Sequence, residues 1–209
     1  MTRTHWAAVT AVVLALLFAG AATVASAGPG TEGRAAAVPA EDSADAGFAR
    51  DMSVHHQQAV EMSFIVRDRT KDEEVRRLAY DIANTQANQR GMMLGWLDMW
   101  GLPKVVAGSE PMAWMDMPSH GPGHSGPLMP GMATADELDR LRTASGRQAE
   151  VLYLRLMTEH HRGGVHMARG CVDRCRPGVE RNLAQGMVDA QESEILLMAD
   201  LLEKRGAKP

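Results

Sequence analysis

Two short motifs of histidine and methionine are the residues of this chain best suited to bind a metal. Each motif has a methionine, two adjacent histidines that begin three residues later, and a second methionine six residues after the second histidine. The eight residues are Met52, His55, His56, Met62, Met157, His160, His161 and Met167. Imidazole and thioether donors suit copper, whereas magnesium and calcium need oxygen ligands. The motifs therefore predict a site for a copper ion, as Cu(I) or Cu(II).

Helical geometry places the four residues of each motif on one face. An α-helix turns by about 100° per residue, so both methionines and both histidines project to the same side. The small residues Ala59 and Gly163-Gly164 lie among them and leave room for close helix approach or for an ion. His166 and its counterpart Glu61 lie on the opposite face, where we expect exposure to solvent. Zinc would accept the histidines, but no thiolate or carboxylate is expected beside them on this face.

The same pattern has a structural alternative. Methionine at helical spacing is common in helical cores, and a buried histidine needs only a hydrogen-bond partner. Core packing explains Met93 and Met198 most directly; they share stripes with Gln86 and Gln191 on the neighbouring helices. If the two halves pair about a pseudo-twofold axis, four histidines and up to six methionines line one seam.

Both motifs are part of a longer internal repeat. An offset of 105 positions (55 to 160) aligns residues 48–101 with residues 153–206 without a gap. Identical pairs include Arg50 and Arg155, Val60 and Val165, Gln86 and Gln191, Met93 and Met198, and Gly101 and Gly206. A register kept over this length indicates a duplicated unit.

Each unit is expected to form a hairpin of two helices. In the first hairpin, residues 44–101, Ser43 or Asp45 is the candidate N-cap and Gly101 marks the end. Apolar residues recur at helical spacing, and no convincing alternating strand is present. Two hairpins with apolar stripes bury them best against each other, which predicts an all-α, antiparallel four-helix bundle.

The second half, residues 134–206, is expected to hold a short helix and then the second hairpin. A capping box from Thr134 to Glu137 opens the short helix. Gly146 either separates that helix from the second histidine-bearing helix or lies within one continuous helix. Pro177 fits the first turn of the last helix.

The N-terminal segment predicts export. Residues 1–27 have a positive start, an apolar run and a small-residue cleavage site that ends at Ala27, as in a signal peptide. An uncleaved membrane anchor is the alternative, because the apolar run approaches spanning length. Either way the bundle is extracytoplasmic: secreted, periplasmic or in the cell envelope. Residues 28–43 are rich in Ala, Gly and Pro and are expected to be disordered. The formal net charge of −4 and the lack of a basic run argue against a nucleic-acid partner.

Cys171 and Cys175 are the two cysteines of the chain, in the turn between the helices of the second hairpin. In an oxidising compartment, a disulfide that pins this turn is the simpler interpretation. A metal site with two thiolates is the alternative, and it too is compatible with copper.

The linker between the hairpins, residues 102–133, carries a second set of possible metal ligands. These are Met112, Met115, Met117, His120, His124, Met129 and Met132. Gly and Pro argue against a packed helix here. The linker either captures copper loosely from outside the bundle or docks its methionines on the bundle.

These motifs resemble a known bacterial family. The segments Met129-Pro-Gly-Met132, Leu141 to Gly146 and Leu156 to His161, with Gln191, Glu194 and Met198, are similar to domain-of-unknown-function family number 305. The resemblance covers nearly all of the chain after residue 27, and it implies a ferritin-like fold. It also implies export, copper binding by the two His-Met motifs, and a role in copper resistance. Gln89 stands where the second copy has Glu194, which argues against Glu194 as one of a matched pair of ligands.

Together these features predict an exported protein that binds copper for sequestration, tolerance or transfer to a copper transporter or chaperone. The sequence has neither a Ser-His-Asp set nor an HExxH motif, so we do not expect an enzyme. A ferritin-like, metal-dependent oxidoreductase is one alternative, although no glutamate lies three residues before a paired histidine and only Glu194 is a plausible inward carboxylate. A structural or partner-binding helical module without metal is the other.

Overall fold

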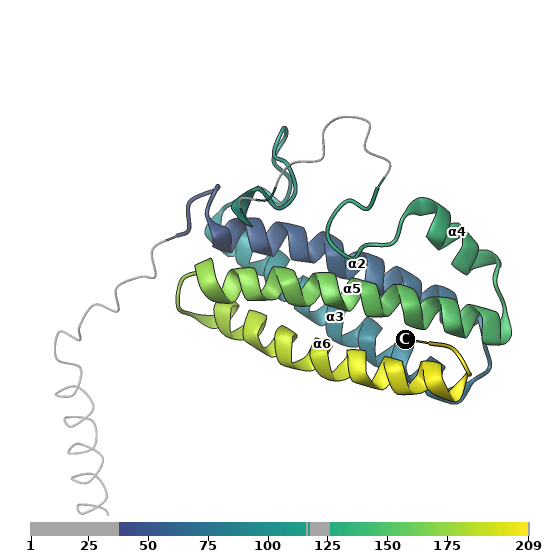
Figure 1. Cartoon of the computed structure of the whole chain (residues 1–209). Coiled ribbons are helices and arrows are strands. Elements are labelled where there is room, and N and C mark those ends of the chain that lie inside the picture. Colours follow the sequence, from purple (N-terminus) through teal and green to yellow (C-terminus); the bar gives the residue numbers. More distant parts are fainter. Residues whose placement is uncertain (1–37, 116, 118–125, 209) are drawn as a thin grey trace, which may run out of the picture. The chain divides into compact units, whose positions relative to one another are not determined.

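Four long helices form an antiparallel bundle in the compact unit Pro39–Pro209. The computed structural model describes residues 38–115, 117 and 126–208. The elements are α2 (Ala44–Arg69), α3 (Glu73–Trp100), the short 3-10 helix η1 (Ala113–Met115), α4 (Ala135–Thr143), α5 (Gly146–Arg174) and α6 (Val179–Lys204). The described part of the chain contains no strand. The predicted all-α helical bundle is confirmed (Figure 1).

Local sequence signals fix where several helices begin and end. The Ser43 side chain accepts a hydrogen bond from the Ala46 amide and caps α2. Gly101 ends α3 in the left-handed region, with φ 65°, a conformation that glycine adopts without a Cβ penalty. Thr134 and Glu137 form the expected capping box of α4.

In the second half of the chain, the structure decides one open alternative and corrects one prediction. Ala144 and Ser145 are extended, so α4 and α5 are separate helices. Pro177 lies before the N-cap Gly178 and not in the first turn of α6. Gly178 is extended, with φ 163°, so the fixed φ of Pro177 acts on the chain before the helix and not within its first turn.

The helices pack as two hairpins, α2 with α3 and α5 with α6, which meet chiefly through α2 and α5 (Figure 1). Apolar side chains form two cores. The first core lies where α2 ends and α5 begins, and it includes Leu78, Ile82 and Tyr153. The second core lies where α2 begins and α5 ends, and it includes Phe48 and Leu97.

The segment that precedes α2 is partly described. Residues 39–43 form a turn in which the Ser43 amide donates to the Ala40 carbonyl, and the Arg50 side chain donates to the Glu41 carbonyl. The last part of the stretch expected to be disordered is therefore ordered. The expected signal peptide and residues 28–37 lie outside the described residues. No helix among the described residues combines the length and apolar character that crossing a membrane requires.

Candidate metal centre

The four motif histidines, His55 and His56 from α2 with His160 and His161 from α5, are completely buried. The rings of His55 and His160 meet where α2 crosses α5, with centroids 3.8 Å apart. His56 and His161 flank that contact, at 6.5 Å and 6.3 Å from their sequence neighbours. Packing of α2 against α5 thus joins the two pairs into one layer, the histidine layer.

The two central rings donate to backbone oxygens. The Nε2–H of His55 donates to the carbonyl of Pro130 at 3.1 Å. The Nε2–H of His160 donates to the carbonyl of His55 at 3.0 Å. Because a carbonyl oxygen only accepts, the proton of each ring must lie on Nε2.

Both flanking rings donate to side chains of the neighbouring helices. His56 donates from Nε2 to the Oε1 of Gln89 on α3, at 2.8 Å. His161 donates from Nε2 to the Oε2 of Glu194 on α6, at 2.7 Å. The two contacts occupy equivalent positions of the 105-residue register, but one acceptor is a neutral amide and the other a carboxylate.

The remaining nitrogen, Nδ1, is buried without a hydrogen-bond partner in all four rings. A neutral ring protonated at Nε2 has its lone pair on Nδ1, and burial keeps the rings of His55, His56 and His160 neutral. Desolvation lowers the pKa of His55 from 6.5 to about 4 and that of His56 to about 3. Desolvation and the nearby rings hold the pKa of His160 well below its ordinary value. Metal-binding histidines commonly hold their other N–H in this way.

Two buried glutamines extend the polar layer. Neither amide atom of Gln86 has a partner, and the Oε1 of Gln191 has none. The Gln191 side chain fills the space that a Cβ on Gly164 would need. A Cβ on Gly163 would likewise collide with the Pro130 carbonyl. The room expected at Gly163-Gly164, for close helix approach or for an ion, is therefore filled by closely packed protein atoms.

Methionine sulfur lies on both sides of the histidine layer. The residues Met52, Met62, Met157 and Met167 are all fully buried. The second core takes Met52 and Met167 together with Met93, and the first core takes Met62 and Met157 together with Met198. The expected single seam of six methionines is therefore divided into two groups of three by the histidines.

Residues 129–133, here called the strap, cross the histidine layer from outside. The Gln58 side chain holds Ala133 twice, donating to its carbonyl at 2.9 Å and accepting from its amide at 2.6 Å. The Pro130 carbonyl lies against Gly163 and accepts from His55. The strap thus supplies one of the oxygens that orient the layer.

The described part of the linker docks on the bundle. Met112 and Met129 are 4% and 2% exposed and belong to the second core, while the partly buried Met115, Met117 and Met132 pack against it. The Met112 amide donates to Asp51 at 2.7 Å. These contacts favour the docking interpretation for the five methionines. His120 and His124 lie outside the described residues.

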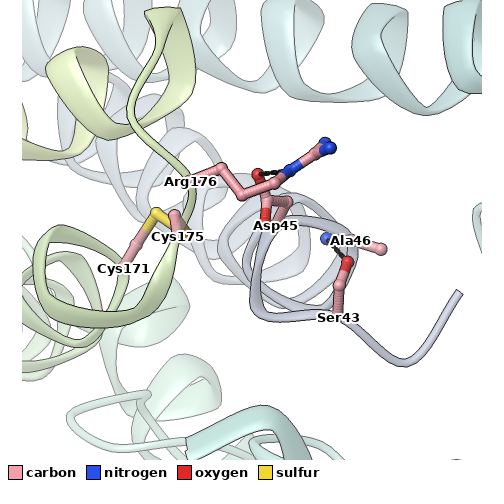
Figure 2. Close-up of a disulfide and its surroundings, with 6 residues drawn as sticks. All are labelled: Ser43, Asp45, Ala46, Cys171, Cys175 and Arg176. Carbon is pink, nitrogen blue, oxygen red and sulfur yellow. Dashed lines mark hydrogen bonds and ion pairs between the residues drawn. A yellow bond between two sulfur atoms is a disulfide. The ribbon is translucent and has the colours of Figure 1, made fainter. Parts of the chain in front are cut away.

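A disulfide joins Cys171 and Cys175, with Cα atoms 4.8 Å apart. Cys171 lies in the last turn of α5 and Cys175 is its C-cap. The adjoining Arg176 forms an ion pair with Asp45 of α2 at 3.2 Å, so the disulfide lies beside the start of that helix (Figure 2). As the structure has them, these sulfurs are bonded to each other and are not thiolate ligands.

The two residues expected on the outer faces differ from each other. His166 is exposed. Glu61 is half-buried and not exposed as expected, because Arg142 of α4 forms an ion pair with it. The short helix α4 covers this side of α2, which the helical-face argument for α2 alone did not include.

Within the described residues, no three His, Cys, Asp or Glu side chains are placed to hold one metal ion together. A metal held at this layer would draw on imidazole nitrogen and thioether sulfur together. Neutral Nδ1 and methionine sulfur are donor types that suit copper. The layer residues therefore suit copper by the chemistry of their donor atoms and by their unpartnered Nδ1 atoms.

The roles of three residues around the layer were not predicted: Gln89 and Pro130 accept from layer histidines, and Gln58 holds the strap. The repeat register offered a signal for Gln89, since Gln89 and Glu194 each follow the second histidine of their motif by 33 positions. Pro130 acts through its backbone carbonyl, which no side-chain pattern reveals.

Comparisons with known proteins agree with this architecture. A family described as Domain of unknown function (DUF305) matches residues 45–202. A DUF305 protein from Streptomyces coelicolor, provisionally described as secreted, is 72% identical; the match covers 81% of this chain and 98% of that chain, with a TM-score of 0.75. A DUF305 fragment from Deinococcus radiodurans is 32% identical, covering 77% and 96%, with a TM-score of 0.64. CopM in its Cu(II)-bound form is 25% identical, covering 75% and 94%, with a TM-score of 0.55. No curated protein matches this chain.

Proposed function

We propose that this chain, which belongs to the DUF305 family, is an exported protein that binds copper in its histidine layer. The observation that carries the proposal is the set of four fully buried Nδ1 atoms without a partner. A buried polar atom left unpaired costs on the order of 1–3 kcal/mol. A bound ion would use these lone pairs, which the fold otherwise leaves unsatisfied.

Copper is the metal that these donors favour. The rings of His55, His56 and His160 are neutral and their Nε2–H groups are already engaged, so their Nδ1 atoms need no deprotonation before they bind a metal. Buried thioethers flank the layer on both sides, and soft sulfur with imidazole suits copper more than magnesium or calcium. The Cu(II)-bound form of CopM, whose fold this chain shares, supports the same choice of metal.

Sequestration, tolerance or transfer suits this site better than catalysis. Di-iron centres in helical bundles use several inward glutamates. Here Glu194 is the one carboxylate hydrogen-bonded to the layer among the described residues. An oxygen-consumption assay with iron or copper tests the alternative, a metal-dependent oxidoreductase, and we expect no turnover.

Export is part of the same proposal. The sequence before the described residues has the features of a signal peptide, and the similar Streptomyces coelicolor protein is provisionally described as secreted. Outside the cytoplasm, the protein would take up copper directly and pass it to a transporter or a copper chaperone.

Copper titration of the chain from Gly28 onward tests the proposal. We expect saturable binding that is lost when the four layer histidines are replaced together by alanine. The matched control is His166→Ala, which removes an exposed histidine of the same helix α5 and should leave binding unchanged.

Two outcomes would count against a buried site. Equal binding by the fourfold variant and the wild type would move copper to the linker. No binding by the wild type would leave the layer as a structural polar core and would support the helical-module alternative.

A further inference from the structure

The four layer histidines have unequal partners. Three of them donate to neutral oxygens: the carbonyls of Pro130 and His55, and the amide of Gln89. Only His161 donates to a carboxylate, that of Glu194. The 105-residue register makes Gln89 and Glu194 equivalent positions, so the two halves of the layer differ by a single charge.

That charge acts on a metal in two ways. A carboxylate that accepts the Nε2–H makes Nδ1 of the same ring a stronger donor. It also offsets the positive charge that an ion brings into a layer of low dielectric. The Glu194 side chain is about one quarter exposed (25%), so water screens its charge only in part. Cu(II) brings twice the charge of Cu(I), so the carboxylate favours Cu(II) more strongly.

We propose that Glu194 is a positioning residue that makes His161 the strongest donor of the layer and biases the bound ion towards Cu(II). The inference rests on the proposed function, since it assumes copper in the histidine layer. In the α2–α3 half, the neutral Gln89 leaves His56 the weaker donor and favours Cu(I) relative to Cu(II).

The chain supplies matched variants for a test. Glu194→Gln keeps the length of the side chain and an oxygen that accepts from His161, but removes the charge. Gln89→Glu adds a charge beside His56. The double variant exchanges the two side chains and leaves the net charge of the protein unchanged.

Affinities for Cu(I) and Cu(II), measured by competition with chelators, and the reduction potential of the bound ion form the readout. We expect Glu194→Gln to weaken Cu(II) binding by about tenfold or more and to change Cu(I) binding much less. The potential should rise by about 59 mV for each tenfold change in the ratio of the two affinities. Gln89→Glu should lower the potential. In the double variant, His56→Ala should become more damaging to Cu(II) binding than His161→Ala, the reverse of the wild-type order.

Different failures have different meanings. Equal weakening of both ions by Glu194→Gln, with an unchanged potential, would make Glu194 a structural residue and overturn the inference. An unchanged order of the two histidine variants in the double variant would also overturn it. If the wild type binds no copper through its histidines, the proposed function fails, and the inference fails with it. Should Glu194→Gln not fold, the potential of Gln89→Glu decides by itself.

Discussion

Each buried histidine of the layer directs one nitrogen to an oxygen and leaves the other without a partner. The Nε2–H of each ring is held by a carbonyl, an amide oxygen or a carboxylate, and Nδ1 has no partner. Because burial disfavours the imidazolium, the rings of His55, His56 and His160 stay neutral where an exposed histidine would be charged. These three rings therefore present lone pairs at pH values at which a free histidine would be protonated.

Acid should destabilise the metal-free protein. Burial lowers the pKa of His55 to about 4 and that of His56 to about 3, from 6.5. The unfolded chain thus binds more protons than the folded one below pH 6.5, so the free energy of unfolding falls as the pH falls. For His55 and for His56, we expect the free energy of unfolding to fall by about 1.4 kcal/mol per pH unit, from pH 6.5 down to the pKa of that histidine in the folded protein.

Urea unfolding at pH 7, 6 and 5 measures this slope. His55→Gln should reduce this slope by about 1.4 kcal/mol per pH unit, the contribution of one proton. His166→Gln, at an exposed position, should leave the slope unchanged. A wild-type slope that His55→Gln does not alter would mean that His55 is not buried in its neutral form.

The buried methionines next to the layer should contribute sulfur to the metal. Replacing Met52 and Met167 by leucine keeps the volume of the second core, so each change should cost less than about 1.5 kcal/mol in stability. Removal of both thioethers should weaken Cu(I) binding on the order of tenfold. Isothermal competition titration measures this loss. Met99→Leu, at a residue 81% exposed, is the control; an affinity that matches this control would make Met52 and Met167 packing residues only.

At the scale of elements, the strap joins the linker to the histidine layer. Its Pro130 carbonyl accepts from His55 and lies directly on Gly163 of α5. Gln58 of α2 fixes the other end through Ala133. Because the strap covers the layer, its contacts with α2 and α5 should limit how fast an ion enters.

Gly163→Ala tests the strap. The new Cβ would collide with the Pro130 carbonyl, so we expect a loss of about 1–3 kcal/mol in stability and faster metal exchange as the strap shifts. Gly186→Ala is the control on α6, where a Cβ meets nothing within 4 Å and should stabilise the helix by about 1 kcal/mol. Stopped-flow copper uptake measures the exchange. Equal uptake rates in both variants would show that the strap does not limit entry.

The first turn of α6 carries a carboxyl group with no hydrogen-bond partner. Glu180 is 3% exposed and both of its oxygens are unpaired. Burial, with the nearby Asp45 charge, raises the pKa of Glu180 from 4.5 to about 8. The folded protein therefore binds more protons than the unfolded chain between these values, and this group makes the fold less stable as the pH rises.

Glu180→Gln should remove that penalty. We expect little change in the free energy of unfolding at pH 4.5, and a gain that grows by about 1.4 kcal/mol per pH unit up to pH 8. Denaturation of the variant and the wild type across this range measures the gain. A constant difference between the two proteins at every pH would contradict the burial of an ionisable Glu180.

For the whole molecule, periodicity and caps were enough to predict the bundle. The caps at Ser43 and Thr134 and the glycine at Gly101 mark helix ends through local hydrogen bonds and φ values. Such signals depend only on neighbouring residues, and the sequence contains them. Helical spacing also placed the histidines on one face, since that relation needs no tertiary information.

The surroundings of the layer could not be predicted in the same way. The path of the strap over Gly163 depends on a linker without periodicity, and it brings in a backbone oxygen. The glycines were expected to leave room for close helix approach or for an ion, and the groups that pack on them are the Pro130 carbonyl and the Gln191 side chain. Both differences arise from contacts between segments far apart in the sequence, which side-chain type and spacing do not encode.

The most direct test of a buried histidine copper site is a long-range proton–nitrogen NMR spectrum of the histidine rings, recorded before and after addition of Cu(I). Without metal, the four layer rings should carry a proton on Nε2, and the rings of His55, His56 and His160 should be neutral. On binding, their Nδ1 signals should shift while the Nε2–H groups stay in place. Shifts confined to His166 or the linker histidines, with the layer Nδ1 signals unchanged, would contradict the account.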